Sequence, residues 1–477
     1  MPLQFGWMSD VLVGSGLIWP VVLARFERFA PAGVMARLAL EHALPADWVD
    51  EVFEAHRQKQ YARELLFSTV VELTTLVSLG LRPSLHAAAR GMDGLPVSLA
   101  SLYDKVNHTE PDVLRALVRG SAARLEPVMA AVGGGRASLP GWRVRVLDGN
   151  HLPGSEKRLL PLRGVRGAAL PGQSLVVYDP DLGLVVDLVA CEDAHASERA
   201  AVLPLLDGAR PGELWIADRH YCTHAVLQGL ENAGAGFIVR EHAKHPRLAG
   251  QGAWQGHGRV EAGLVREQEI MPAEAQAPWR RIELALDRPT EGGDTAIRLW
   301  SNLPAEIGAG QIAELYRMRW RIEGMFGRLE SVLHSEVGSL GHPRAALLGF
   351  AAAVLAYNVL ALLQRCVEQA HQPPPDALPP TAPPLEVSCF HLAQRVKSSY
   401  EGLLVALPPE HWPHWCDTDP AGLAQHMLRL ARNINPRQVA TSKRAPKPKA
   451  PKGYVDGKTA RTHVATARVL AQTKTTP

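Results

Sequence analysis

Three polar side chains near the middle of the chain have the types and the spacing for chemistry on a phosphate group. They are Tyr316, Arg319 and Glu323, and offsets of three and four residues place side chains on one face of a helix. Two aspartates upstream, Asp148 and Asp218, each follow a short apolar run that predicts a strand. Two carboxylates at strand ends and a third on a later helix predict a pocket for divalent metal, which suits phosphodiester chemistry.

The five side chains divide into metal ligands and phosphate contacts. Phosphodiester cleavage needs an activated water and a stabilised leaving oxygen, and two divalent ions about 3.5–4 Å apart supply both. We expect Asp148 to bridge two Mg²⁺ ions, with Mn²⁺ as the alternative, while Asp218 holds one ion and Glu323 the other. We expect Arg319 and Tyr316 to bond phosphate oxygens, because a guanidinium matches a phosphate bidentately.

Each of these residues also has a purely structural interpretation. Asp148 precedes Gly149 and could be a turn aspartate, and Asp218 could cap a short helix. Arg319 and Tyr316 could form a surface salt bridge and a packed ring. The residues taken together favour the catalytic interpretation.

The same segments carry a resemblance to a known family. The spacing Tyr-x2-Arg-x3-Glu at Tyr316 and the words LWSNLP, YRMRWRIE, DRHY and FIVRE resemble the DDE-type transposases of bacterial insertion sequences. The resemblance covers residues 140–365 and is to the cut-and-paste subgroup whose signature continues with x6-Lys. Glu330 stands in the place of that lysine.

This resemblance implies a fold, an activity and partners. It implies an α/β fold with an RNase H-like mixed β-sheet core, a β-rich insertion before the last catalytic helix, and helical regions on both sides. The implied enzyme is a transposase that nicks transposon ends at their inverted repeats and joins the 3′-OH to target DNA. Its implied catalytic and metal-binding residues are Asp148, Asp218 and Glu323. Its implied partners are double-stranded DNA and a second copy of the chain in a synaptic homodimer, with no membrane.

Further DNA contacts are expected around the catalytic residues. In addition to Tyr316 and Arg319, we expect Arg240, Arg328 and Trp300 to contact DNA. Trp254, Trp279 and Trp300 are candidates for stacking on an extruded base, which aromatic rings favour. Packing in a core is the alternative for each tryptophan.

Two other classes of function stay open. Glutamate at Glu330 repels phosphate where the family has lysine, which favours a catalytically inactive transposase acting as a DNA-binding repressor. The other alternative is an RNase H-like host nuclease without strand transfer.

Composition indicates a soluble intracellular protein with a basic end. The net charge of +3, the 46% hydrophobic content and the 21% charged content are ordinary. Residues 431–477 hold eleven Lys or Arg and one acid, which predicts a DNA-contacting tail or, alternatively, a solubilising extension. Five scattered cysteines indicate reduced thiols, and the N-terminus lacks a signal-peptide pattern. We expect a bacterial cytoplasmic protein associated with the nucleoid.

Pattern changes along the chain predict its domains. Residues 1–135 are predicted to be a helical domain that binds DNA ends, with helices at 34–43, 46–79 and 111–132. A helix at 95–107 belongs either to a helix-turn-helix or to an ordinary bundle. Residues 140–370 are predicted to be the catalytic domain, with its insertion at about 241–303. A proline-rich linker (371–387), a helical segment (388–432) and a disordered basic tail (433–477) follow.

The strand pattern within the catalytic domain predicts the order of an RNase H-like core. Three strands from residue 142 are followed by a helix at 197–206, a strand at 214–217, a helix at 224–232 and a strand at 236–239. Residues 345–363 are apolar enough to cross a membrane, but they contain Asn358 and follow the signature helix. We therefore predict a buried helix over the sheet.

Overall fold

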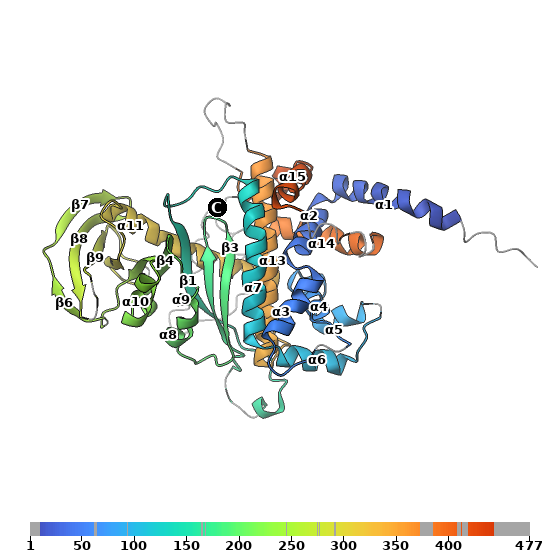
Figure 1. Cartoon of the computed structure of the whole chain (residues 1–477), viewed down its shortest axis with the longest axis horizontal. Coiled ribbons are helices and arrows are strands. Elements are labelled where there is room, and N and C mark those ends of the chain that lie inside the picture. The colour runs from blue at the N-terminus through green and yellow to red at the C-terminus, as the bar shows by residue number, and fades with distance from the viewer. Residues whose placement is uncertain are drawn as a thin grey trace, which may run out of the picture. The chain divides into compact units, whose positions relative to one another are not determined.

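The computed structural model describes residues 10–442 apart from 62–63, 93, 164–165, 167, 245, 274, 276, 291, 373–384, 408–411 and 413–417. Most of the predicted linker and of the predicted basic tail therefore lies outside the described residues. The described residues belong to one compact unit, Met1–Val439, except for the first few of a second unit, Ala440–Pro477. The fold is mixed α/β, with helices packed on a mixed sheet (Figure 1).

Five strands form the part of the sheet that carries the two aspartates. They are β1 (Arg143–His151), β2 (Gln173–Asp179), β3 (Leu184–Cys191), β4 (Glu213–Ala217) and β5 (Gly236–Arg240). Their spatial order is β3-β2-β1-β4-β5. The first three are antiparallel neighbours, while β4 runs parallel to both β1 and β5. The predicted strands and their chain order are confirmed.

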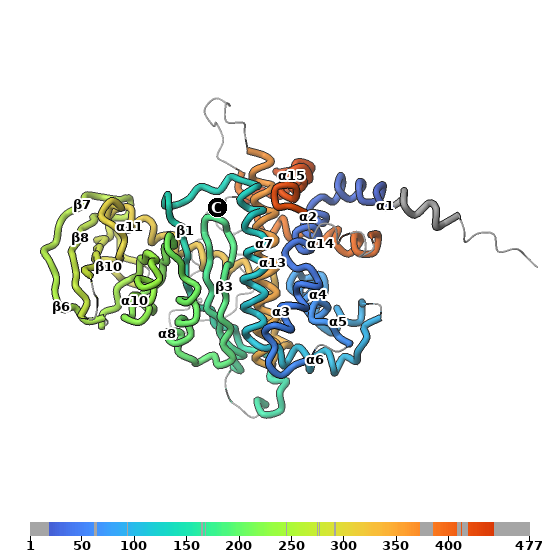
Figure 2. Tube along the Cα trace, in the orientation of Figure 1, coloured from blue at the N-terminus to red at the C-terminus, as the bar shows by residue number. Residues whose placement is uncertain are grey.

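The segment after β5 extends the same sheet. It contains β6 (Leu248–Gln251), β7 (Gln255–Val260), β8 (Gly263–Pro272), β9 (Trp279–Leu286) and β10 (Ala296–Ser301). Strand β10 pairs with β5, so the sheet continues through β10, β9, β8 and β6, and β7 pairs with β8. Figure 2 follows the chain out along these strands and back into α11 (Ala309–Tyr316). The segment predicted as a β-rich insertion is thus hydrogen-bonded to the strands that precede it.

Two long helices, α7 (Pro111–Val132) and α13 (Pro343–Ala370), pack together and on β3 (Figure 1). Helix α13 is long and apolar enough to span a membrane, but its most apolar window is entirely buried inside the protein. Its Asn358 exchanges two hydrogen bonds of 2.8 Å with the backbone of Val185 on β3. The predicted buried helix is confirmed, because a polar residue in an apolar helix has found backbone partners.

The N-terminal helices share the hydrophobic core of α13. They are α1 (Asp10–Phe29), α2 (Pro31–Ala43), α3 (Ala46–His56), α4 (Phe67–Ser78), α5 (Leu85–Arg90) and α6 (Leu99–His108). The prediction of one helix over 46–79 was wrong. The chain turns between α3 and α4 so that Phe53 and Phe67 stack, with ring centroids 4.6 Å apart. The apolar faces of α3 and α4 both pack into one core, which a turn between the two helices allows and a single continuous helix does not.

Shorter elements complete the described chain. They are η1 (Leu160–Leu162), α8 (Glu198–Ala201), α9 (Leu203–Leu206), η2 (Arg219–Tyr221), α10 (His224–Asn232), η3 (Arg317–Arg319), α12 (Trp320–Leu333), α14 (Cys389–Ala406), α15 (Pro420–Ala431) and α16 (Pro436–Val439). The helix predicted at 197–206 is therefore two short helices. The segment with Tyr316, Arg319 and Glu323 is also not one regular helix, because the 3₁₀ turn η3 separates α11 from α12.

Candidate active site

Asp148 and Asp218 lie side by side where the parallel pairing of β1 and β4 ends. This pairing ends at Leu147 opposite Ala217, so the next residue along the chain is Asp148 on β1 and Asp218 just after β4. Alternate side chains of a strand point to opposite faces. Val146 and Ile216 belong to the core under α7 and α13. Asp148 and Asp218, two residues further along, therefore emerge on that same face.

Backbone amides next to each aspartate fix its carboxylate. Asp148 Oδ1 accepts a hydrogen bond from the Gly149 amide at 3.0 Å. Asp218 Oδ1 accepts one from the His220 amide at 2.7 Å and so caps the 3₁₀ turn η2. The capping interpretation of Asp218 therefore holds together with its place beside Asp148.

Arg319 connects Asp148 to Glu323. Its Nη1 lies 3.2 Å from Asp148 Oδ2, and its Nη2 lies 2.7 Å from Glu323 Oε1. The 3₁₀ turn rotates Arg319 toward β1 while keeping the i,i+4 contact with Glu323. The side chain of Arg319 is 15% exposed, and its Nε has no hydrogen-bond partner among the described residues. This Nε–H donor is thus buried, and the Tyr316 hydroxyl lies close to the guanidinium.

The Asp148 carboxylate has too little compensating charge around it. Burial, helped by the neighbouring carboxylates of Asp218 and Glu323, raises the pKa of Asp148 from 3.8 to about 6. The attraction of Arg319 and the hydrogen bond from the Gly149 amide act in the opposite direction. A partly buried carboxylate that a single arginine does not neutralise favours an added cation.

Tyr316 and Arg240 lie on the same side as the carboxylates. Tyr316 is 7% exposed, and burial raises the pKa of its phenol to about 12, while the charges of Arg319, Arg240 and Asp218 also act on it. The phenol therefore stays protonated and can donate a hydrogen bond. Arg240 Nη2 pairs with Asp294 Oδ2 at 2.8 Å, and this contact lowers the pKa of Asp294.

The remaining predicted DNA contacts have other surroundings. Arg328 is exposed on α12; partial burial of its guanidinium acts to lower its pKa, but the nearby Tyr357 and Tyr178 raise the pKa overall. Trp300 and Trp279 are each 1% exposed, with ring centroids 6.3 Å apart. In this conformation neither ring offers a face to a base, because both are buried in a second hydrophobic core, which also contains Leu147, Tyr221 and Phe237.

Two other tryptophans are better placed for contact with a ligand. Trp254, on the connection between β6 and β7, is partly exposed, and its ring centroid lies 4.5 Å from Arg266 Cζ and 5.6 Å from Arg281 Cζ. Trp320 directly follows Arg319 and is 62% exposed. Trp320 is not among the predicted DNA contacts, and its one signal in the sequence is its position inside the signature segment.

The carboxylates fit divalent metal ions in type and charge. Three carboxylates with a shortage of positive charge suit a hard cation that takes oxygen ligands. Among the described residues no group of three or more His, Cys, Asp or Glu side chains is already gathered to hold a metal. The guanidinium of Arg319 lies between Asp148 and Glu323 instead. Metal ligation by these two side chains together therefore requires Arg319 to turn away.

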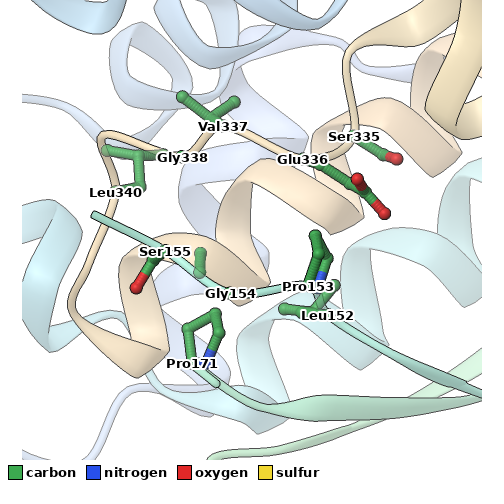
Figure 3. Close-up of a pocket in the computed structure, with 11 residues that line it drawn as sticks. Leu152, Pro153, Gly154, Ser155, Pro171, Ser335, Glu336, Val337, Gly338 and Leu340 are labelled. Atoms are coloured by element: carbon green, nitrogen blue, oxygen red, sulfur yellow. The ribbon is translucent and has the colours of Figure 1, made fainter. Parts of the chain in front are cut away.

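A cavity of about 190 Å³ lies where β1 and α12 lead into their following loops (Figure 3). Its walls come from residues 152–155 and from Ser335, Glu336, Val337, Gly338 and Leu340. The cavity contains none of the three candidate ligands. Glu336 is its acidic residue, and burial raises the pKa of that carboxyl, as does the nearby Glu330.

Comparison with known proteins agrees with this geometry. Residues 146–359 match the model of the family described as the transposase DDE domain. The match spans β1 to α13, covers less than half of the chain, and supports a DDE-type transposase, an enzyme that acts on DNA. No curated protein matches the chain.

One solved structure matches the chain at low sequence identity. It is the cryo-EM structure of the piggyBac transposase synaptic complex with hairpin DNA. The sequence identity is 9%, the alignment covers 83% of this chain and 86% of the other, and the TM-score is 0.34. A TM-score this low does not establish a common fold.

Proposed function

We propose that this chain is a DDE transposase that cleaves transposon ends at inverted repeats and joins the freed 3′-OH to target DNA, moving the element by cut and paste. The transposase DDE domain match over residues 146–359 supports the class. The observation that carries the proposal is the position of Asp148 beside Asp218, with Arg319 linking Asp148 to Glu323.

The fold part of the proposal is an RNase H-like core. The strand order β3-β2-β1-β4-β5, with β4 and β5 parallel to β1, supports it. Strands β6 to β10 lie between β5 and α11 and are the proposed β-rich insertion. The domain boundaries stay a prediction, since the N-terminal helices share the core of α13.

The proposed catalytic residues act through charge and position. Asp148, Asp218 and Glu323 would hold two Mg²⁺ or Mn²⁺ ions, which when bound activate the attacking oxygen and stabilise the leaving one. Asp148 must be deprotonated for this role. Arg319, once free of its carboxylates, has a buried Nε–H and two Nη groups to donate to a phosphate.

Tyr316 and Arg240 would position the scissile strand. The phenol of Tyr316 stays protonated and donates to a phosphate oxygen. Arg240 would bind a phosphate group in place of Asp294, since the aspartate and a phosphodiester group each carry one negative charge.

The wider proposal concerns partners and location. Double-stranded DNA is the partner, at transposon ends and at the target, and a homodimer holds two ends in one synaptic complex. The basic tail contributes charge for DNA. The protein would work in the bacterial cytoplasm, at the nucleoid.

The test is cleavage of DNA that carries the ends flanking the gene, with Mg²⁺ or Mn²⁺. We expect wild type to cut at the ends and Asp148→Asn to lose cutting by a factor of at least about 10³, as expected when a metal ligand is lost. Asp193→Asn, an exposed aspartate on the connection after β3, is the matched control and should cut normally. Sequence-specific binding by wild type without cutting would reject the enzyme.

A repressor is the second candidate function, and Glu330 favours it. Glu330 is exposed on α12, seven residues after Glu323, where it repels a DNA backbone. A repressor would bind the ends as tightly as an active transposase and bind no divalent metal. Calorimetric titration of the protein with Mn²⁺ separates the two functions.

A further inference from the structure

Behind the two aspartates, on the opposite face of the sheet, lies a fourth carboxylate that no motif singles out. Glu198 begins the short helix α8, and its side chain is 19% exposed. Gly149 alternates with Asp148 along β1 and therefore faces the other way. The carboxylate of Glu198 lies against that backbone, because a Cβ on Gly149 would stand 2.8 Å from Glu198 Oε1. Glycine at 149 thus makes room for Glu198.

The same carboxylate contacts the turn that follows Asp218. The Tyr221 hydroxyl donates a hydrogen bond of 3.1 Å to Glu198 Oε2, and His220 Nε2 lies 3.8 Å from the same oxygen. Tyr221 is 1% exposed, so this hydrogen bond is anchored in the second core. The neighbouring Arg199 Nε donates to the His220 carbonyl at 3.0 Å. Helix α8 therefore binds the η2 turn at several points.

Glu198 also reaches the end of β1. His151 Nδ1 lies 4.0 Å from Glu198 Oε1. On β1 the carboxylate therefore lies against Gly149 and His151, and on the turn it contacts His220 and Tyr221. Gly149 and His220 are also the residues whose amides bond Asp148 and Asp218. One side chain thus contacts the immediate support of both aspartates.

We propose that Glu198 is a positioning residue that ties the end of β1 to the η2 turn and so sets the separation of Asp148 and Asp218. Supports of metal ligands matter in this way because they fix the orientation of each ligand before the ion binds. This inference rests on the proposed function insofar as the two aspartates are metal ligands. The contacts of Glu198 with the end of β1 and with the η2 turn do not depend on the proposed function.

The first measurement tests the tie without any activity. Hydrogen–deuterium exchange is compared at residues 148–152 and 218–222 in wild type, Glu198→Ala and Glu192→Ala. Glu192 is the matched control, because it lies on the same connection but pairs with Arg344 at 2.8 Å. We expect faster exchange in both segments for Glu198→Ala and in neither for Glu192→Ala. Unchanged exchange in both segments of Glu198→Ala would overturn the proposal.

The second measurement separates positioning from general stability. Glu198→Ala should raise the Mn²⁺ concentration for half-maximal cleavage by about tenfold or more, the usual effect of losing a support of a metal ligand. DNA affinity measured in EDTA should stay unchanged. Glu198→Gln keeps an acceptor for Tyr221 and should restore most of the metal response. An equal loss in Glu198→Gln and Glu198→Ala would contradict a role through the Tyr221 hydrogen bond.

A pair of variants guards against a fold defect in Glu198→Ala. In Gly149→Ala the added methyl group displaces the Glu198 carboxylate from the backbone of β1 but leaves the carboxylate in the protein. The effect of Gly149→Ala on hydrogen exchange and on the metal response should therefore match that of Glu198→Ala. The double variant should be no worse than either single one, because both remove one contact. Additive losses would reject the shared contact. If wild type fails to cleave, the proposed function fails, while the exchange results still decide whether Glu198 ties the two segments.

Discussion

Toward each end of β1 an arginine lies between two carboxylates. The two clusters differ in how far their side chains are buried and in how completely they are hydrogen-bonded. At the start of the strand Arg145 pairs with Asp179 and, at 3.0 Å, with Glu213, and all three side chains are at most 12% exposed. At the other end Arg319 pairs with Asp148 and Glu323, where the Glu323 side chain is 57% exposed.

The difference lies in how completely each cluster is satisfied. Asp179 Oδ1 also accepts the amides of Asp181 and Leu182, at 3.0 and 2.9 Å, so the first cluster is closed. In the second, Arg319 Nε has no partner among the described residues and burial raises the pKa of Asp148. A closed ionic cluster serves the fold, whereas an open one retains capacity for a ligand.

The largest expected effect comes from breaking the closed cluster. Arg145→Ala should lower the free energy of unfolding by about 3–5 kcal/mol, because it leaves the carboxylates of Asp179 and Glu213, at most 12% exposed, without a counter-charge. Arg143→Ala is the matched control on the same strand: its pair with Glu126 is half-exposed and should be worth at most about 1 kcal/mol. Thermal melting compares the two variants, and equal losses would contradict the distinction.

The open cluster should respond in function rather than in stability. Arg319→Ala should reduce cleavage by about 10²–10³, the usual cost of losing one donor to a reacting phosphate. Its Mn²⁺ affinity without DNA should rise, because the guanidinium no longer competes for Asp148 and Glu323.

Arg317→Ala, on the same 3₁₀ turn but half-exposed, should change neither quantity. A lower metal affinity in Arg319→Ala would show that Arg319 organises the carboxylates instead of standing between the ion and its ligands.

Asp148 gives a pH dependence whose sign follows from its raised pKa. Its folded pKa of about 6 exceeds the unfolded 3.8, so the charged form costs stability above pH 6, and this cost disappears below pH 3.8. At pH 8 the free energy of unfolding of Asp148→Asn should therefore be about 2–3 kcal/mol higher than that of wild type, and its melting temperature should be higher as well. The gain should vanish near pH 4. Melting curves at both pH values decide, and a gain independent of pH would refute the cause.

The smallest expected effect concerns the exposed end of α12. Glu330→Lys should tighten DNA binding and steepen its salt dependence by about one additional phosphate contact, a slope change of about 0.9. Binding isotherms at several salt concentrations measure it. Glu330→Gln separates loss of repulsion from gain of attraction. No change in either variant would place Glu330 away from the DNA path.

Local pattern was enough to predict the strands and the residues at their ends. Alternation of apolar and polar residues gave β1, and a short apolar run followed by Asp218 gave β4. Both features depend on neighbours within a few residues, which is the range that periodicity reports. The apolar run in α13 likewise predicted burial, since Asn358 and the surrounding chain disfavoured a membrane.

Local pattern failed where the decisive partner was far away in sequence. The turn between α3 and α4 follows from the contact of Phe53 with Phe67, and the 3₁₀ turn η3 places Arg319 against Asp148, 171 residues earlier. Burial of Trp300 likewise depends on Trp279 and the strands that carry both rings. Composition alone does not distinguish a packed tryptophan from an exposed one.

The amino-acid sequence by itself determined which residue types are available for phosphate chemistry and on which local elements they stand. Only the tertiary structure decided that Arg319 stands between Asp148 and Glu323, that Arg240 is paired with Asp294, and that Glu198 lies against the backbone of Gly149 and bonds Tyr221. The physical reason is that spacing along the chain fixes the direction of a side chain within its own element. Charge compensation is fixed by the packing of elements that are distant in sequence.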